Sequence, residues 1–316
     1  MIAFLFPGQG AQAVGMGKAL ADHFPECREV FDEADAALGE PLSDLIFNGP
    51  AERLTLTENA QPAILTASTA AYRLLASRGI QPQQVAGHSL GEYSAHVAAG
   101  TLDFADAVRL VRHRGRYMQE AVPVGTGAMA AILGLDAEKV EQACAEAAEG
   151  DVVSPANLNA PGQVVIAGAA AAVARAVARA KALGAKRAIP LQVSAPFHCA
   201  LMKPAEVRLT PELRAVATSP PRVPVVANVD AQPKLDADAC IEALIRQIAS
   251  PVRWEDVMRR LIADGARIFV EVGPGTVLSG LGGKIASDVS YTHIDSPEHL
   301  ENVVAMIAVN QLRGRA

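Results

Sequence analysis

Short runs of apolar residues alternate along the chain with longer stretches in which apolar side chains recur every three or four positions. Residues 2–6, 84–88 and 268–272 are such short runs, and each leads into a turn that contains glycine. Runs of this length followed by helical spacing predict strands that alternate with helices. The expected fold class is therefore α/β, with a largely parallel sheet.

The middle of the chain follows a different pattern. Strands are expected at 128–133, 164–167 and 188–193, with a short extended piece at 152–155, and Ala-rich helices at 136–148 and 169–183. This order resembles a small ferredoxin-like α+β unit. We expect residues 125–194 to form this inserted subdomain, and residues 1–124 and 195–316 to form the main core.

Composition excludes several classes of function. The chain has 316 residues, of which 50% are apolar, and 28 basic against 34 acidic residues give a net charge of −6. This balance gives no support for nucleic-acid binding. The four cysteines lie far apart, which fits a reducing compartment, and neither a signal peptide nor a membrane span is evident. We expect a cytoplasmic protein.

Charge is divided inside the expected subdomain. Residues 136–151 contain six acids and one lysine, whereas residues 152–205 contain six bases and no acid. Such runs are typical of a solvated helix face. The alternative is a docking surface for an acidic partner, which the net charge conceals. The candidate residues of that surface are Arg175, Arg179, Lys181, Lys186 and Arg187.

A GxSxG sequence lies between an expected strand and an expected helix, where residues 87–91 read Gly-His-Ser-Leu-Gly. This context is what a nucleophile elbow requires. The glycines allow a tight turn, and the start of the helix favours negative charge that develops beside Ser89. Ser89 is therefore the candidate nucleophile.

A serine nucleophile needs a base. His88 is expected to point away from Ser89, and His113 falls opposite the buried stripe of a helix at 103–121, facing water. The histidines expected at the surface or in helix packing are His23, His96, His293 and His299. His198 remains as the candidate base, and a core histidine without a catalytic role is the alternative.

The same helix separates its arginines. Arg109, Arg112 and Arg116 cluster on one side, as a solvated face would. Arg114 lies on the opposite flank of the buried stripe. It either covers apolar surface with its stem or presents its guanidinium to a cleft, where it would bind a carboxylate.

A second candidate loop follows the first expected strand. Gln9 lies there between two glycines, so its backbone N–H is exposed in a way that suits an oxyanion hole. The loop lacks both the GxxxxGK[ST] and the GxGxxG pattern, so it is not a phosphate loop.

Seven segments resemble, in order, the malonyl-CoA:acyl carrier protein transacylase family of bacterial fatty acid synthesis. They are FPGQG at 6–10, GHSLGE at 87–92, RHRGRYMQEAV at 112–122, GAMAAILGL at 127–135, NAPGQVVIAG at 159–168, PFHCALMKP at 196–204 and VGPGTVLSGL at 272–281. The resemblance extends over essentially the whole chain. It implies an α/β-hydrolase-like core with a ferredoxin-like insertion.

The resemblance also implies an activity. A malonyl group would pass from malonyl-CoA, through a malonyl-serine ester, to the phosphopantetheine thiol of acyl carrier protein, for fatty acid biosynthesis. The implied roles are nucleophile for Ser89, general base for His198, carboxylate binding for Arg114, oxyanion-hole N–H groups for Gln9 and Leu90, and orientation of the histidine by the Gln247 carbonyl. No cofactor and no metal is implied. The carrier of this family is acidic, so the stretch 175–187 is a candidate docking surface on a protein expected to be a monomer.

Two other classes of function share part of this pattern. A serine esterase or thioesterase would use the same elbow serine, without a need for an arginine that binds a carboxylate. A non-catalytic partner-binding module would keep the fold and leave Ser89 inert toward malonyl-CoA.

Overall fold

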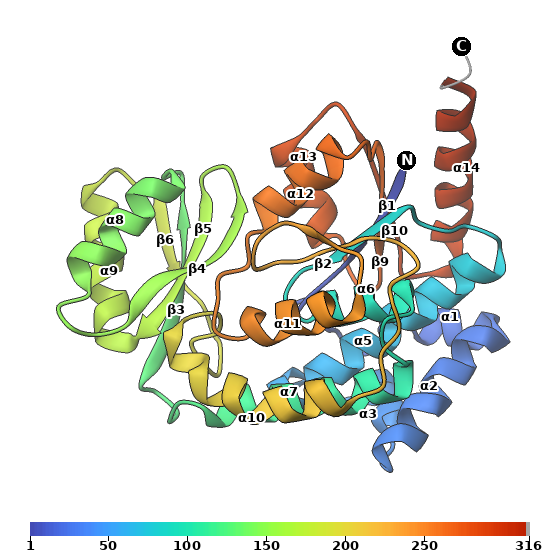
Figure 1. Ribbon diagram of the computed structural model, residues 1–316, viewed down its shortest axis with the longest axis horizontal. Coiled ribbons are helices and arrows are strands. Elements are labelled where there is room, and N and C mark those ends of the chain that lie inside the picture. Colours follow the sequence, from blue (N-terminus) through green and yellow to red (C-terminus); the bar gives the residue numbers. More distant parts are fainter. Residues whose placement is uncertain (314–316) are drawn as a thin grey trace.

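The computed structural model describes residues 1–313, and side chains up to residue 310, as two sheets with helices packed around them (Figure 1). The larger sheet has the strand order β10-β9-β1-β2-β7-β8. Its strands are β1 (Ile2–Phe6), β2 (Gln84–Gly87), β7 (Val225–Val226), β8 (Pro233–Lys234), β9 (Ile268–Val272) and β10 (Ser290–Ile294). All neighbours are parallel except β7 and β8. The predicted α/β class with a largely parallel sheet is confirmed.

Helices account for most of the chain between these strands. Those before β7, outside the smaller sheet, are α1 (Lys18–His23), α2 (Pro25–Leu38), α3 (Leu42–Asn48), α4 (Ala51–Thr55), α5 (Thr57–Ser77), α6 (Gly91–Ala99), α7 (Phe104–Glu120), the 3₁₀ turn η1 (Ala200–Met202) and α10 (Lys203–Ala215). Those after β8 are α11 (Ala237–Gln247), α12 (Trp254–Ala263), α13 (Val277–Ile285) and α14 (Pro297–Arg313). None of the helices in residues 1–313 has the length and apolarity that a bilayer span needs.

Strand β1 shows why helices lie on both faces of this sheet. Phe4 and Phe6 pack into an apolar cluster with α2, α5, α6 and α7, whereas Ala3 and Leu5 pack into a second cluster with α12 and α13. Successive side chains of a strand point to opposite faces, so a strand that is apolar throughout must be covered twice.

The smaller sheet is antiparallel and has the order β4-β5-β3-β6. Its elements are β3 (Gly127–Leu133), α8 (Ala137–Ala147), β4 (Val153–Ala160), β5 (Gln163–Ala169), α9 (Ala170–Ala182) and β6 (Arg187–Pro190). This β-α-β-β-α-β succession with its strand order is the ferredoxin-like arrangement. It lies at the left of Figure 1, beside the larger sheet. The exact division of the chain at residues 125 and 194 stays a prediction.

Two expectations for this smaller sheet need correction. The short piece expected at 152–155 is a full strand, β4, whose register shifts at two places around Asn157. The strand expected at 188–193 ends at Pro190, and Leu191 to Val193 leave the sheet to line a pocket. An irregular strand and a chain that turns into a site both break the two-residue alternation on which strand prediction relies.

Candidate active site

One pocket lies where the carboxyl ends of β1 and β2 meet. Phe6 pairs with Gly87 in the sheet, so the loops that follow place Gln9 and Ser89 side by side. Ligands of open α/β sheets commonly bind at this edge. The smaller sheet completes the wall with Met129 and Asn157.

The nucleophile elbow depends on its two glycines. A Cβ on Gly87 would lie 1.9 Å from the carbonyl oxygen of Gly91, and a Cβ on Gly91 would lie 2.0 Å from that of Phe6. Ser89 itself has a φ of 53°, which is left-handed backbone that serine rarely adopts. Strain of this kind persists where the surroundings hold it, and it typically marks a functional turn.

His198 lies against Ser89. The Ser89 hydroxyl is 2.6 Å from Nε2 of His198, and Nδ1 of the same ring is 3.1 Å from the backbone carbonyl of Gln247. A carbonyl only accepts, so Nδ1 carries the proton and Nε2 is free to accept the serine proton. Burial, followed by repulsion from Arg114, lowers the pKa of His198 to about 3. The ring is therefore neutral near pH 7, as a base must be.

Arg114 is a buried cation at the bottom of the pocket. Only 1% of the residue is exposed. Its guanidinium donates to the side-chain oxygens of Gln61 (2.8 Å), Gln247 (2.8 Å) and Ser89 (3.2 Å). None of these acceptors is a carboxylate, and no ion pair of Arg114 exists among residues 1–310. A buried charge without a counter-ion in contact is costly, so this guanidinium is a candidate receptor for an anion.

The two oxyanion-hole candidates face the same pocket. Gln9 and Leu90 both line it. In the part of the chain that the structure describes, neither backbone N–H donates to a protein acceptor. Leu90 is the N-cap residue of α6, so its N–H belongs to the helix end that favours negative charge.

Other sequence expectations have mixed outcomes. His88 binds Asn159 through Nε2 (2.8 Å), and His96 is fully buried without a hydrogen-bond partner among the described residues. The expectation that His113 faces water is only partly right, because α10 covers it and Glu212 binds Nδ1 at 2.6 Å.

The solvated position expected for Arg112 is wrong. Its side chain is only 16% exposed, since Asn59 of α5 and Glu40 of the turn between α2 and α3 bind its guanidinium.

Sequence reasoning missed three buried polar residues that surround the candidate site. Gln61 from α5 binds Arg114. Asn228 accepts a hydrogen bond from the backbone N–H of Ser89, and Glu92 accepts one from the backbone N–H of Asn228. Glu92 had a usable signal, because an acid directly after a GxSxG motif falls in the first turn of the helix. Gln61 and Asn228 had none, since each meets the site through a contact distant in sequence.

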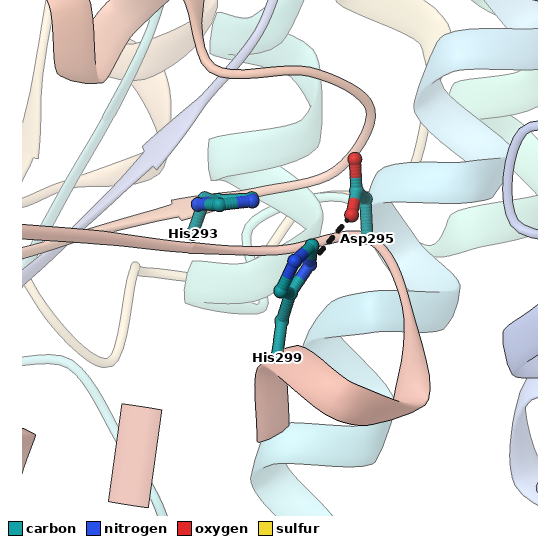
Figure 2. Close-up of side chains that lie close together, drawn as sticks. All are labelled: His293, Asp295 and His299. Carbon is teal, nitrogen blue, oxygen red and sulfur yellow. Dashed lines mark hydrogen bonds and ion pairs between the residues drawn. The ribbon is translucent and has the colours of Figure 1, made fainter. Parts of the chain in front are cut away.

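One group of side chains among the described residues has the right types and spacing to hold a metal ion. His293, Asp295 and His299 lie together where β10 leads into α14 (Figure 2), with ligand atoms within 4.8 Å of one another. Asp295 already accepts hydrogen bonds from Nδ1 of His299 (2.8 Å) and the N–H of Gly275 (3.3 Å). None of the three lines the pocket, so this group is separate from the serine chemistry.

Comparisons with known proteins agree with this geometry. The model of the acyl transferase domain family matches residues 3–289. A malonyl CoA-acyl carrier protein transacylase of Escherichia coli (strain K12) is 54% identical over 296 residues, which are 93% of this chain and 96% of the relative. The crystal structure of an acyl carrier protein S-malonyltransferase from Vibrio cholerae superposes with a TM-score of 0.94 at 48% identity, covering 96% of this chain and 99% of that one.

A third match was solved as a complex. It is a malonyl-transacylase bound to its type II polyketide synthase acyl carrier protein, with a TM-score of 0.94, 48% identity, and coverage of 96% of this chain and 98% of that one. The fold and the serine–histidine pocket thus define an acyltransferase. Within that class, the chain belongs to the malonyl-CoA:acyl carrier protein transacylase family.

Proposed function

We propose that this chain transfers a malonyl group from malonyl-CoA to the phosphopantetheine thiol of acyl carrier protein, and so supplies malonyl-carrier for fatty acid synthesis. One observation carries the proposal at the level of residues. The Arg114 guanidinium, which pairs with no carboxylate of residues 1–310, lies 3.2 Å from the Ser89 hydroxyl that His198 activates. The carboxylate and the thioester carbonyl of malonyl-CoA are separated by one methylene, so a carboxylate held by Arg114 leaves that carbonyl beside Ser89.

Acylation of the enzyme is the first half-reaction. The Ser89 oxygen attacks the thioester carbonyl while its proton passes to Nε2 of His198. The N–H groups of Gln9 and Leu90 stabilise the resulting oxyanion, with a contribution of about 3 kcal/mol per donor. The carbon–sulfur bond then breaks, His198 returns the proton to the leaving sulfur, and free CoA departs from a malonyl-Ser89 ester.

Transfer to the carrier reverses these steps. The phosphopantetheine thiol gives its proton to His198 and attacks the ester carbonyl, and the Ser89 oxygen recovers that proton as it leaves. The group at Nδ1 of His198 is the Gln247 carbonyl, so no acid among the described residues orients the histidine. This serine–histidine pair differs from the Ser-His-Asp triad of many esterases, which favours transfer over an esterase reading.

The test is intact-protein mass spectrometry after brief exposure to malonyl-CoA, with Ser89→Ala as the control. We expect a malonyl adduct on the wild type alone, and its discharge when the holo carrier is added. An adduct that water removes as fast as the carrier does would identify a thioesterase instead. Absence of any adduct would contradict catalysis by Ser89 altogether.

The carrier is expected to dock on the basic side of the subdomain. Two of the five candidate docking residues already have acidic partners in this chain, since Arg175 pairs with Asp151 (3.1 Å) and Arg179 pairs with Glu146. Lys181, Lys186 and Arg187 are exposed and take part in no ion pair among the described residues. We therefore assign docking to these three.

Charge reversal tests that assignment. The triple variant Lys181→Glu, Lys186→Glu and Arg187→Glu is expected to raise KM for the carrier about tenfold at low salt, with KM for malonyl-CoA unchanged. Lys139→Glu, an exposed lysine on α8, is the matched control. Equal effects of the triple variant and the control on the carrier KM would rule this surface out.

We also place the reaction in the cytoplasm, where the four free and buried thiols would stay reduced.

A further inference from the structure

A single buried carboxylate oxygen lies beneath the active site. Glu92 is in the first turn of α6 and is 0% exposed. Its Oε2 accepts two hydrogen bonds, from the backbone N–H of Asn228 (3.0 Å) and from the side-chain Nε2 of Gln247 (2.7 Å). Its other oxygen has no partner among the described residues. Every directed contact of the carboxylate therefore goes to these two groups.

Both partners of Glu92 hold the backbone of the nucleophile. Asn228 accepts the Ser89 N–H at 2.7 Å and donates to the Gly87 carbonyl at 2.7 Å. Gln247 donates to the Ser89 carbonyl at 2.9 Å. Because the left-handed turn at Ser89 is strained, its geometry depends on contacts that hold the peptide groups on each side.

Gln247 connects the same carboxylate to the base and to the cation. Its backbone carbonyl accepts from Nδ1 of His198 (3.1 Å), and its side-chain oxygen accepts from Arg114 (2.8 Å). The side-chain amide thus lies between the Arg114 guanidinium and the Glu92 carboxylate. If Glu92 paired directly with Arg114, an incoming carboxylate would have to displace it. The intervening amide leaves the guanidinium open.

Glu92 is poorly suited to carry a proton in the reaction itself. It is not among the residues that line the pocket. Burial raises its pKa to about 7. Either protonation state leaves an oxygen that can accept from Asn228 and Gln247, so these contacts do not require a permanent charge.

We propose that Glu92 is a positioning residue, whose single acceptor oxygen sets the relative placement of Ser89, His198 and Arg114 through Asn228 and Gln247. The inference rests on the proposed function, because it concerns the same site. A displacement of about 1 Å in such a constellation typically costs on the order of 100-fold in rate. In this proposal, the geometry of the site depends on the position of the Glu92 acceptor oxygen more than on the charge of the carboxylate.

Two conservative variants distinguish the position of the Glu92 acceptor oxygen from the charge of its carboxylate. Glu92→Gln keeps an oxygen at the position of Oε2 and removes the charge, whereas Glu92→Asp keeps the charge and withdraws the acceptor by one methylene. We expect Glu92→Gln to retain kcat within about tenfold of wild type, and Glu92→Asp to lose about 100-fold in kcat. KM for malonyl-CoA and the preference for malonyl over acetyl report separately on Arg114. In Glu92→Asp, we expect this KM to rise and this preference to decrease.

Glu271→Ala is the matched control. Glu271 is another fully buried carboxylate, and it accepts two backbone N–H groups, from Leu278 (2.9 Å) and Ser279 (2.7 Å), at the start of α13. Its loss should lower Tm but leave kcat per folded molecule close to wild type, since neither Glu271 nor its two hydrogen-bond partners line the pocket. All rates are normalised to the fraction of Ser89 that malonyl-CoA can acylate.

The outcomes discriminate clearly. Activity in Glu92→Asp that exceeds activity in Glu92→Gln would overturn the proposal in favour of a role for charge. Near-normal kcat in both variants, with Tm lowered as in Glu271→Ala, would reduce Glu92 to a structural residue. Failure of the wild type to form a malonyl adduct would instead count against the proposed function, and the same assay reports it.

Discussion

Two regions of the molecule gather charged side chains and use them in opposite ways. Beneath the pocket, Arg114 and Glu92 are almost completely buried and share Gln247 as a common partner. Between α8 and α9, Arg179 pairs with Glu146, and both side chains are about two-fifths exposed. Water and salt screen the exposed pair strongly, but they screen the buried charges of Arg114 and Glu92 very little.

The difference shows why a count of charged residues says little about function. The acids at 136–151 and the bases that follow them are conspicuous in the sequence. Part of this charge, however, lies in exposed pairs that α9 makes with α8 and with the loop after α8. Exposed pairs typically contribute little to stability. The charges beneath the pocket are few, but each lies where removal leaves a buried partner unsatisfied.

The largest effect is expected from Arg114→Ala. We predict that kcat/KM for malonyl-CoA falls by about 100- to 1,000-fold, because a desolvated ion pair of this kind is worth about 2–5 kcal/mol. Transfer from acetyl-CoA, which has no second carboxylate, should change far less. Steady-state kinetics with both substrates measure the ratio.

Arg112→Ala is the control for the Arg114 variant, since Arg112 lies on the same helix and binds Asn59 (2.5 Å), outside the pocket. It should leave the malonyl-to-acetyl preference unchanged. A parallel decline of both substrates in Arg114→Ala would mean that Arg114 supports the site without selecting the substrate.

The sequence anticipated the regular parts of this molecule better than the buried polar ones. Strands β1 and β9 match their predicted bounds, because unbroken apolar runs that end in glycine-containing turns leave little choice. Ser89 was evident from its motif, whereas the angle of Arg114 on its helix left two alternatives open, and only the family resemblance implied that it binds a carboxylate. Strand β4 was underestimated, because Pro155 and the register shifts near it interrupt the alternation.

The network below the site could not be predicted from local pattern. Glu92 meets Asn228 across 136 positions and Gln247 across 155. Periodicity shows which face of an element is buried, but it does not show which buried polar groups from different elements meet. The helical wheel failed at Arg112 for the same reason, since it cannot show that a neighbouring helix covers that flank.

A smaller effect tests whether burial alone distinguishes the two regions. His96 is on the same helix as Glu92 and is fully buried, but neither ring nitrogen has a partner among the described residues. We predict that His96→Leu raises the free energy of unfolding near pH 7.5 by about 1–2 kcal/mol, because it removes buried polar atoms that make no hydrogen bond. Catalytic activity should be unchanged.

The pH dependence of the His96 variant provides a second measurement. Burial lowers the pKa of His96 from 6.5 to about 3, so between these values the unfolded state binds more protons than the folded one. The free energy of unfolding of the wild type therefore decreases as pH falls below 6.5, because only the unfolded state can protonate this ring. The advantage of His96→Leu should grow by about 1 kcal/mol between pH 7.5 and 5.5 in urea unfolding. A gap that stays constant would mean that His96 is already solvated.

The smallest effect is expected in the subdomain. Arg179→Ala removes the exposed pair with Glu146, and we predict no measurable change in Tm at physiological salt, because the two side chains are already hydrated. Arg175→Ala should cost more, since that guanidinium also binds the carbonyls of Ala147 (2.8 Å) and Ala148 (2.9 Å) at the end of α8. Differential scanning calorimetry of both variants decides the matter. If Arg179→Ala lowers Tm as much as Arg175→Ala does, the two backbone contacts of Arg175 add nothing measurable to stability. The exposed pair of Arg179 with Glu146 would then be stronger than its hydration implies, and exposure would not explain the contrast with the pocket.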